Sequence, residues 1–331
     1  MKRRQDIVTI RALAILVVML GHSIIIYSSG WNLYPTIQSA PALAHVKDII
    51  NVMQMPLFFS VSGFCLVFTL SSKRGVSVLD KVKRLLIPFL IVGLCWMIPL
   101  RLALGYPGYR GQPLWRIVLV DLLLDVDSGH LWFLPTLMLM FIVVIAAYKL
   151  CTAVRWPEWS FEVVLVVLAM GAAGAVVIFS GLETVPYAGR FGHNFLFFVM
   201  GYVWHRHEGI IMPMKTSIGR VVSAALLVAA CVAIWFGVGA TGIVSVAFAL
   251  IMVACIYVLV PDWSSEPVRL ISKDSMGLYL FHSPMLYISF ALWPDIAPWL
   301  MVLINFVGFG LCALGITELL RRLHLGFVLG E

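Results

Sequence analysis

Residues 7–27 read IVTIRALAILVVMLGHSIIIY, an apolar run long enough to cross a bilayer, for which about 20 residues are needed. Arg11 and His22 are its two strongly polar interior residues, eleven positions apart. Eleven residues make about three helical turns with about 20° of drift, so both side chains share one face, about 16 Å apart along the axis. The run predicts a membrane-spanning helix with a cation and an imidazole on one side.

Two interpretations of this helix stay open on the stretch alone. A basic residue inside a span costs about 2.5–3.5 kcal/mol on insertion scales, so an intramembrane ionisable residue indicates a functional site. Alternatively, Arg11 is a topology anchor near the cytosolic end and His22 is a hydrogen-bonded core histidine. The rest of the chain favours the functional interpretation.

The composition is that of a polytopic membrane protein. The chain has 331 residues, of which 62% are hydrophobic and 12% charged, against about 25% charged in soluble domains. No segment is long or polar enough for a soluble domain, so one membrane domain is expected over residues 1–331. The net charge of +7 comes from short basic clusters between apolar runs, a pattern that sets membrane orientation and does not suggest nucleic-acid binding.

The six cysteines are scattered singly through apolar runs, without C-x-x-C or any other metal-ligand spacing. We therefore expect small apolar side chains in the core or facing lipid, and no metal site. They are Cys65, Cys95, Cys151, Cys231, Cys255 and Cys312.

We predict an all-α fold of about ten transmembrane helices. The expected spans are 7–27, 50–70, 85–104, 130–150, 162–181, 190–205, 219–237, 241–260, 275–293 and 298–320. With a cytoplasmic N-terminus, 18 of the 23 Lys and Arg residues fall on the cytoplasmic side and 5 outside. Because cytoplasmic loops carry an excess of basic residues, both termini are expected in the cytoplasm. The five expected outside are Lys47, Arg101, Arg110, Arg116 and Arg190.

Two of the expected outer segments, residues 28–49 and 105–129, are longer than the others. Their aromatic residues and mixed charges suit sugar binding, and they also suit an aromatic belt at the membrane interface. These residues include Trp31, Tyr34, Tyr106, Tyr109, Arg110, Trp115, Arg116, Asp121, Asp125 and Asp127. Residues 114–126 are expected to form a helix lying on the surface.

Five further motifs carry polar residues into apolar surroundings. They are MPLFFSVSGF (55–64), KRLLIPF (83–89), HLWFLP (130–135), FFVMGY (197–202) and SMGLYLFHSP (275–284). Ser60, Ser62 and Gly63 make a small patch typical of close helix packing. Lys83 and Arg84 suit either a positive-inside anchor or a phosphate contact. Each histidine alone is more often structural, but several in so apolar a chain indicate a site.

Together with RALAILVVMLGHS (11–23), these motifs resemble acyltransferase family 3, the integral-membrane O-acyltransferases, in order and over most of the chain. The spacing from Arg11 to His22 matches the family's pattern of Arg and His with ten residues between them. The resemblance implies transfer of an acyl group from cytosolic acyl-CoA to a hydroxyl of a cell-surface or lipid-linked polysaccharide. It also implies the bacterial cytoplasmic (inner) membrane and a chain buried in the lipid bilayer.

The chain departs from the family pattern at three positions. The family often has Asp three residues before the arginine, Gly just after it, and His before the MPLFF motif. Val8, Ala12 and Gln54 stand at these positions here. An Asp-assisted role is therefore not expected, and Asp6 lies at the wrong offset to replace that residue cleanly.

On this resemblance, His22 is the candidate base for the acceptor hydroxyl, and Arg11 is a candidate for holding CoA or polarising the thioester. Lys83 and Arg84 are candidate acyl-CoA contacts. Candidates for contacts to the acceptor or the oxyanion are Ser62, His130, Trp132, Arg190 and His282. Acetyl-CoA, or another acyl-CoA, is expected as co-substrate, with a glycan acceptor and no bound cofactor.

The main alternative is a transporter or flippase for a glycan or lipid-linked sugar, because intramembrane His and Arg also serve proton coupling. Against it, the sequence has no inverted repeat and no paired broken spans. A polysaccharide polymerase and a non-catalytic scaffold are further alternatives. The acceptor, acetyl against succinyl as the acyl group, direct transfer against an acyl-histidine intermediate, and homo-oligomer formation stay open.

Overall fold

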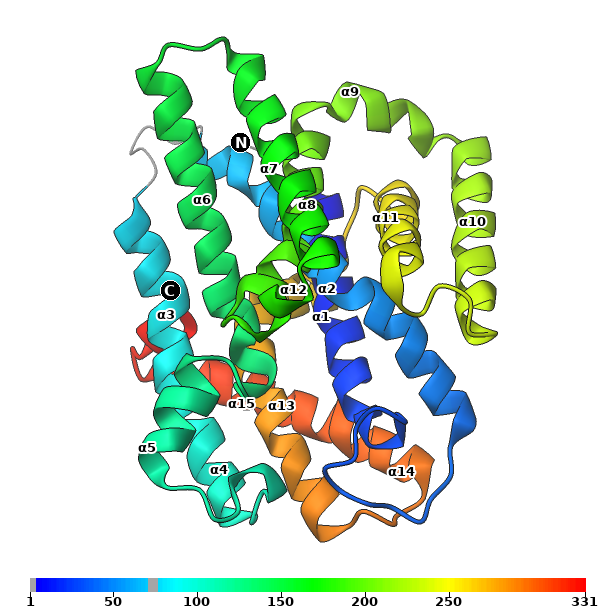
Figure 1. The fold of residues 1–331 in the computed structure, drawn as a ribbon. Helices are drawn as coiled ribbons and strands as arrows, with labels where there is room; N and C mark the ends of the chain where they lie inside the picture. The colour runs from blue at the N-terminus through cyan, green and yellow to red at the C-terminus, as the bar shows by residue number, and fades with distance from the viewer. Residues whose placement is uncertain (1–3, 71–76) are drawn as a thin grey trace. The chain divides into compact units, whose positions relative to one another are not determined.

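The computed structural model describes residues 4–70 and 77–331, apart from the side chains of residues 180 and 210–212. All regular elements within these residues are helices (Figure 1). Eight helical stretches among them are long and apolar enough to cross a membrane. They are Gln5–Ser23, Pro41–Leu70, Val78–Ala103, Gly129–Ala153, Glu158–Ile178, Ser217–Trp235, Gly242–Leu259 and Pro298–Arg322. The chain is therefore an all-α integral membrane protein, as the composition predicted.

Each of the eight stretches overlaps one expected span. The other two expected spans also form helices, α8 (Ala188–Arg206) and α13 (Ser275–Leu292). Both are less apolar, since α8 begins and ends with charged and histidine side chains and α13 carries His282 and several serines. Of the basic residues used for the orientation, Lys2, Arg3, Lys73 and Arg74 lie outside the described residues.

The two long connections differ in part from expectation. Residues 28–49 were expected to be a loop, but α2 (Pro41–Leu70) begins nine residues before the span predicted at 50. The apolar window alone missed this start because Lys47 and Asp48 interrupt it. Residues 114–126 were expected to be helical, and α5 (Leu114–Arg116) continues into a π-helical turn, η4 (Ile117–Leu123).

The chain forms two compact units, and the single-domain expectation stays a prediction. Unit 1 comprises Met1–Phe58, Cys95–Gly111 and Gly209–Leu329. Unit 2 comprises Phe59–Leu94, Gln112–Glu208 and Gly330–Glu331. α2 and the π-helical turn η2 (Gly93–Met97) each contribute to both units.

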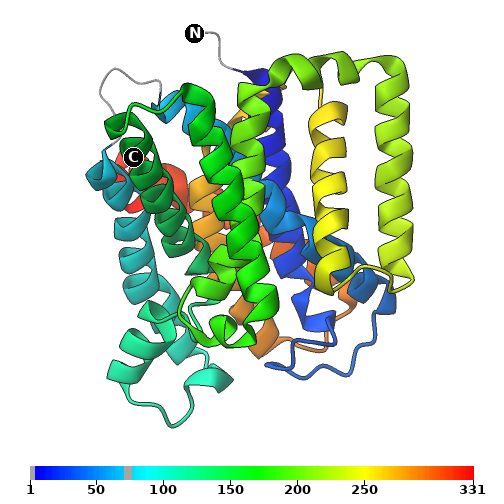
Figure 2. The ribbon, with the colours of Figure 1, turned by 45° about the horizontal axis from the view of Figure 1, so that its top comes forward.

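Unit 1 is built around α1 (Gln5–Ser23), which packs against α11, α12, α13 and α14. α13 in turn packs against α15 and α4. α10 and α11 form a hairpin, whose helices lie side by side in Figure 2. The other helices of this unit are η1 (Ile25–Tyr27), α4 (Ile98–Ala103), η3 (Pro107–Tyr109), η7 (Met212–Lys215), α10 (Ser217–Trp235), α11 (Gly242–Leu259), α12 (Glu266–Lys273), α14 (Pro298–Val302), η8 (Leu303–Gly308), α15 (Phe309–Arg322) and η9 (Gly326–Leu329). α9 (Glu208–Ile211) begins at the last residue of unit 2's range Gln112–Glu208 and continues into unit 1.

Unit 2 is a bundle in which α6 packs against α3, α7 and α8, and α7 packs along α8 (Figure 1). Its helices are α3 (Val78–Val92), η5 (Gly129–Trp132), α6 (Phe133–Ala153), α7 (Glu158–Ile178), η6 (Ser180–Thr184) and α8, besides α5, η4 and the second half of α2.

The small patch predicted on α2 is a packing surface in unit 2. A Cβ on Gly63 would overlap the carbonyl group of Phe198, and a Cβ on Gly201 would overlap that of Ser60. Backbone therefore meets backbone where α2 and α8 cross, a contact that only small residues allow. This contact joins two motifs, MPLFFSVSGF and FFVMGY, that were singled out separately in the sequence.

We predict that Gly201→Ala lowers the free energy of unfolding of the purified protein by about 1–3 kcal/mol, and with it the melting temperature, because the new methyl group overpacks the α2–α8 crossing. Gly171→Ala in α7 is the matched control, since a Cβ there meets nothing within 4 Å. Replacing a helical Gly by Ala in open space should leave stability unchanged or raise it. Equal melting temperatures of the two variants in detergent would contradict the close contact.

Candidate functional site

The two intramembrane histidines of unit 1 form a pair. His22 is in the last turn of α1, and His282 is in the middle of α13. Nδ1 of His22 lies 3.2 Å from Nε2 of His282, and the rings are nearly parallel, with centroids 5.3 Å apart. His282 is completely buried, whereas His22 is partly exposed. The site is therefore a stacked, hydrogen-bonded imidazole pair between two helices.

Hydrogen bonding assigns the tautomers of both rings. Nδ1 of His282 lies 2.6 Å from the carbonyl oxygen of Leu278, which can only accept, so this nitrogen carries a hydrogen. Burying an ionised group is costly, so we assign His282 as neutral, with the lone pair on Nε2. His22 then donates from Nδ1 to that lone pair. In this tautomer, Nε2 of His22 holds a lone pair suited to accept a proton.

Arg11 joins the same two helices at the other end of α1. Its Nε donates to Oγ of Ser275, at 2.8 Å, and Ser275 is buried at the first position of α13. Arg11 and His22 thus lie on one face, as their spacing predicted, and that face is covered by α13. Because Arg11 meets the start of α13 and His22 meets its middle, the two helices run parallel.

A buried polar network fixes the end of α1 against α13. The side chain of Asn305, in η8, donates to the carbonyl of Ser23 at 3.2 Å and contacts Oγ of Ser289 at 2.5 Å. Asn305, Ser23 and Ser289 are completely buried. Buried polar groups are costly unless paired, so this network specifies the register of three helices next to His22.

The start of α13 is held by α15. Arg321 forms an ion pair with Asp274, the residue before α13. Gly277 provides the close approach one turn later, where a Cβ would overlap the side chain of Thr317. α15 therefore runs antiparallel to α13 and holds the start of that helix.

Lys47 lies against Gly21, the residue before His22 in the chain, and was missed as a site residue. It is only 3% exposed and makes no hydrogen bond or ion pair with the described residues. A Cβ on Gly21 would lie 3.4 Å from Nζ of Lys47 and 2.8 Å from Oε1 of Gln54, which is buried without a hydrogen bond. The missing side chain at Gly21 thus leaves room for an ammonium and an amide against α1, one residue before His22.

A family model described as an acyltransferase domain matches residues 5–320, nearly the whole chain. The chain belongs to acyltransferase family 3. No curated protein and no solved structure matches it significantly. The resemblance drawn from the ordered motifs is therefore confirmed for the acyltransferase as a whole.

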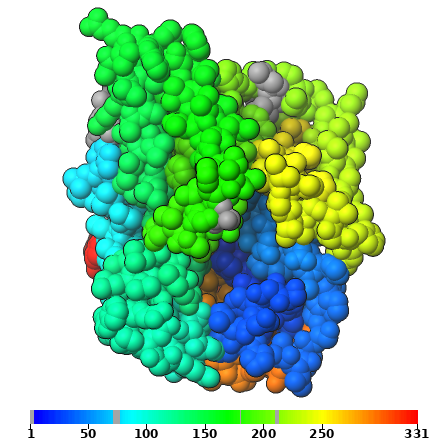
Figure 3. Space-filling view, in the orientation of Figure 1, coloured from blue at the N-terminus to red at the C-terminus, as the bar shows by residue number. Residues whose placement is uncertain are grey.

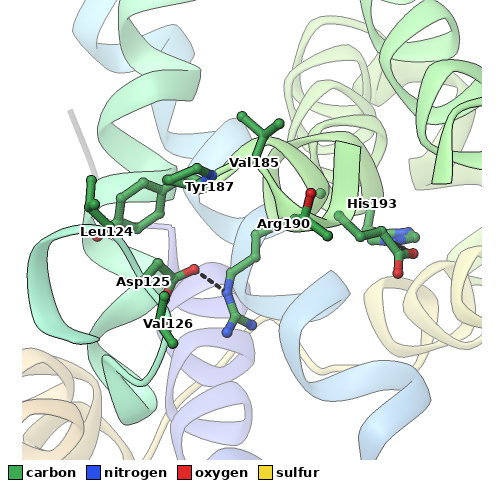
Figure 4. A pocket seen from close by; sticks show the side chains of 11 residues that line it. Leu124, Asp125, Val126, Val185, Tyr187, Arg190 and His193 are labelled. Atoms are coloured by element: carbon green, nitrogen blue, oxygen red, sulfur yellow. Dashed lines mark hydrogen bonds and ion pairs between the residues drawn. The ribbon is translucent and has the colours of Figure 1, made fainter. Parts of the chain in front are cut away.

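The remaining predicted site residues of the acyltransferase lie in unit 2. The guanidinium of Arg190 lies 4.5 Å from the ring of Trp132 and forms an ion pair with Asp125, with Nε 2.5 Å from Oδ2 (Figure 4). His130 is buried in η5, beside Trp132. Ser62 is partly exposed on α2, and Lys83 and Arg84 are exposed near the start of α3. Trp132 and Arg190 are thus brought together, whereas Lys83 and Arg84 stand on another helix.

Arg101 of the acyltransferase is a second residue that the sequence analysis did not single out. It is 1% exposed and donates to the hydroxyls of Tyr109, at 3.1 Å, and Tyr287, at 2.7 Å. Its guanidinium lies 4.3 Å from the ring of Tyr106, whose neighbour Tyr34 has its pKa raised to about 12 by burial. Tyrosines from residues 28–49 and 105–129 and from α13 therefore pack around a buried cation within unit 1.

The acyltransferase offers no cluster for a metal among the residues that the structure describes. No group of three or more His, Cys, Asp or Glu side chains in them is placed to hold a metal ion. Two imidazoles alone are too few for the sites that zinc usually occupies.

Proposed function

We propose that this acyltransferase moves an acetyl group from cytosolic acetyl-CoA to a hydroxyl of a cell-surface or lipid-linked polysaccharide, in the bacterial cytoplasmic membrane. The proposal is carried by the His22–His282 pair, which leaves the lone pair of His22 Nε2 on a partly exposed ring. A hydroxyl is a poor nucleophile near neutral pH, and an imidazole is the usual base for it. Family membership gives no support to the transporter or flippase alternative.

In the proposed reaction, His22 acts first as base and then as acid. Nε2 takes the proton of the acceptor hydroxyl while the hydroxyl oxygen attacks the thioester carbonyl carbon. The carbon–sulfur bond then breaks, and the CoA sulfur leaves with the proton from His22. The products are the O-acyl glycan and free CoA. General base catalysis of this kind contributes about 10²–10⁴-fold.

His282 acts on His22 and not on the substrate. Its single N–H is engaged by the carbonyl of Leu278, so the neutral ring has no second hydrogen to give to an oxyanion. Its Nε2 instead fixes the tautomer and the orientation of His22, the task that a carboxylate performs in Ser-His-Asp triads. His282 is therefore a positioning residue, which favours this role over the oxyanion contact first considered.

The donor side of the reaction involves cations. Ser275 fixes the Nε edge of Arg11, and the guanidinium is suited to hold or polarise the acyl thioester. Lys83 and Arg84 keep their proposed contact with CoA phosphates, because exposed basic side chains near the start of α3 suit phosphate binding.

Lys47 supplies positive charge for the oxyanion of the tetrahedral intermediate. A buried ammonium without an acceptor among the described residues is expensive inside a membrane protein, so its retention indicates a charged or polar substrate group. Donors aimed at developing charge in a water-poor site are usually the largest contribution to acyl transfer. Gly21 permits this approach, and it directly precedes His22 in the chain.

The direction of α13 supports ten spans with both termini in the cytoplasm. Two parallel spans must be separated by an odd number of crossings, but only six of the eight apolar stretches lie between α1 and α13. α8 supplies the seventh, because it lies antiparallel to α7: Arg206 at its end pairs with Glu158 and Glu162 at the start of α7, and Gly192 near its start meets Val176 near the end of α7. These seven spans, together with α1, α13 and the stretch α14–α15 that runs antiparallel to α13, make ten.

We predict that His22→Ala lowers thiol release from acetyl-CoA by about 100-fold or more, because the base is removed. The assay uses protein in nanodiscs with an extract of the host's surface glycans. Arg11→Ala should impair release strongly. His282→Gln should retain more activity than His282→Leu, since only the amide can accept from His22 Nδ1. The exposed His207→Ala is the control, and normal release by His22→Ala would end this mechanism.

For Lys47→Met we expect kcat to fall by about 10–10³-fold, within the range of a lost oxyanion donor. The melting temperature should stay level or rise, because an apolar stem replaces an unpaired buried charge. If Lys47 only stabilised the end of α1, stability would fall and the activity of the folded protein would not. Lys149→Met, an exposed lysine on α6, is the control.

The proposed topology predicts where reporters fused to the chain are found. An alkaline phosphatase fused after residue 186, between α7 and α8, should be active outside the cytoplasm. Fusions after residues 156 and 331 should be inactive, and fluorescent-protein fusions there should be bright. Phosphatase activity at residue 331 would contradict an even number of spans.

A further inference from the structure

Unit 2 contains a pocket that the mechanism above does not use. It has a volume of about 430 Å³, within the range of about 300–1,000 Å³ typical of small-molecule sites. Its lining comes from residues 124–126 and from the segment between α7 and α8 with the first two turns of α8 (Figure 4). Both segments lie on the face shown in Figure 3. The pocket is therefore made by two connections at one end of the helical bundle.

The wall of this pocket is rigidly held. Asp125 has a left-handed backbone with φ of 61° and accepts hydrogen bonds from Ser128 and Arg190. Tyr187 is likewise left-handed, with φ of 60°, and its hydroxyl donates to the backbone carbonyl of Leu123 at 3.1 Å. Left-handed backbone costs energy for non-glycine residues and clusters at functional sites. Two such residues from separate segments thus frame one cavity.

The polar groups of the pocket come in balanced pairs. Asp125 is paired with Arg190 on one side, and Glu183 faces His193 at 3.3 Å on the other. Burial raises the pKa of Tyr187, so its hydroxyl stays protonated. Carboxylates on both sides oppose an anionic ligand, and the paired polar groups oppose a purely apolar one. A guanidinium that donates and carboxylates that accept instead match a neutral ligand with many hydroxyls.

The pocket also has aromatic and aliphatic surface that suits a sugar. The ring of Tyr187 lines the pocket, together with Leu124, Val126 and Val185, which are about half exposed. The face of Trp132 supports the Arg190 guanidinium from outside the lining. Sugar rings present apolar C–H faces as well as hydroxyls, so a polar wall beside small apolar patches suits them.

The charges within unit 2 indicate which membrane side the pocket faces. Its opposite end, where α3 and α7 begin and α6 and α8 end, carries most of the basic residues described in this unit. They are Lys81, Lys83, Arg84, Lys149, Arg155 and Arg206. The pocket end carries only Arg116 and Arg190. The excess of positive charge on the cytoplasmic side puts the pocket outside the cytoplasm.

We infer that this pocket binds a neutral saccharide unit of the acceptor glycan through the Asp125–Arg190 pair and Tyr187. The inference rests on the proposed function and deepens it, because it names the chemical class of the acceptor and the residues that hold it. The reacting hydroxyl need not belong to the bound sugar, since a polysaccharide can occupy several positions along its length. The subsite would therefore act mainly on the affinity for the acceptor.

The test measures saccharide binding directly, without turnover. Tryptophan fluorescence of the nanodisc protein is titrated with a panel of neutral trisaccharides of glucose, galactose, mannose and rhamnose, and with trigalacturonate and inorganic phosphate. The double variant Asp125→Asn/Arg190→Gln should lose at least about tenfold in affinity for the neutral ligand that binds best, equivalent to about 1.4 kcal/mol. Changing both partners avoids leaving one charge uncompensated.

The matched control is Glu162→Gln/Arg206→Gln, which removes an ion pair with a similarly exposed arginine at the other end of α8. It should bind the saccharide as the wild type does. Unchanged affinity in the pocket variant, preference for trigalacturonate or phosphate, or no binding of any neutral member would each overturn the inference.

Failure of this inference can be told apart from failure of the proposed function. His22→Ala should bind the saccharide with wild-type affinity while losing thiol release. The pocket variant should show a raised KM for the glycan extract and nearly unchanged kcat. Saccharide binding without any thiol release from the wild type would overturn the acyl-CoA reaction and leave the pocket standing.

Discussion

The hydrogen bond between His22 and His282 is the interaction on which the described part of unit 1 depends. Two imidazoles inside apolar helices must satisfy each other or reach water, because an unpaired buried polar group is costly. The pairing sets α1 and α13 parallel and in one register. The network through Asn305 and the ion pair of Asp274 with Arg321 then tie both helices to η8 and α15. The polar residues are thus also the residues that specify the packing.

Small residues complement these polar contacts, because they let the helices approach closely. Gly277 brings α15 against α13, and Gly21 opens space for Lys47 and Gln54. In unit 2, Gly63 and Gly201 let α2 and α8 cross with backbone contact. Inside a membrane there is little hydrophobic drive between helices, so such close approach is a main source of their association. Motifs that read as apolar packing patches therefore specify how helices pack within each unit.

Local periodicity was sufficient to predict most of the helices and the position of His22, one of the two paired histidines. The spacing of Arg11 and His22 placed them on one face, and eight expected spans coincide with apolar helices. The partners on that face could not be predicted, since Ser275 and His282 are more than 250 residues away in sequence. Lys47 was assigned to a loop because a charge ends an apolar window, although the helix continues through it. The pocket depends on two backbone conformations that carry no signal in sequence.

The neutral partner of His22 has a consequence for the proposed chemistry. A carboxylate in place of His282 would stabilise the imidazolium more strongly, but it would add a buried charge inside an apolar helix pair. A neutral imidazole fixes the tautomer at lower desolvation cost, and leaves the imidazolium less stabilised. The proposed oxyanion forms in the same step and carries the opposite charge. If Lys47 stabilises that oxyanion, the cation compensates on the substrate side for what His282 does not provide on the base side. The proposed step creates the imidazolium of His22 and the oxyanion together, so it needs His282 and Lys47 at the same time.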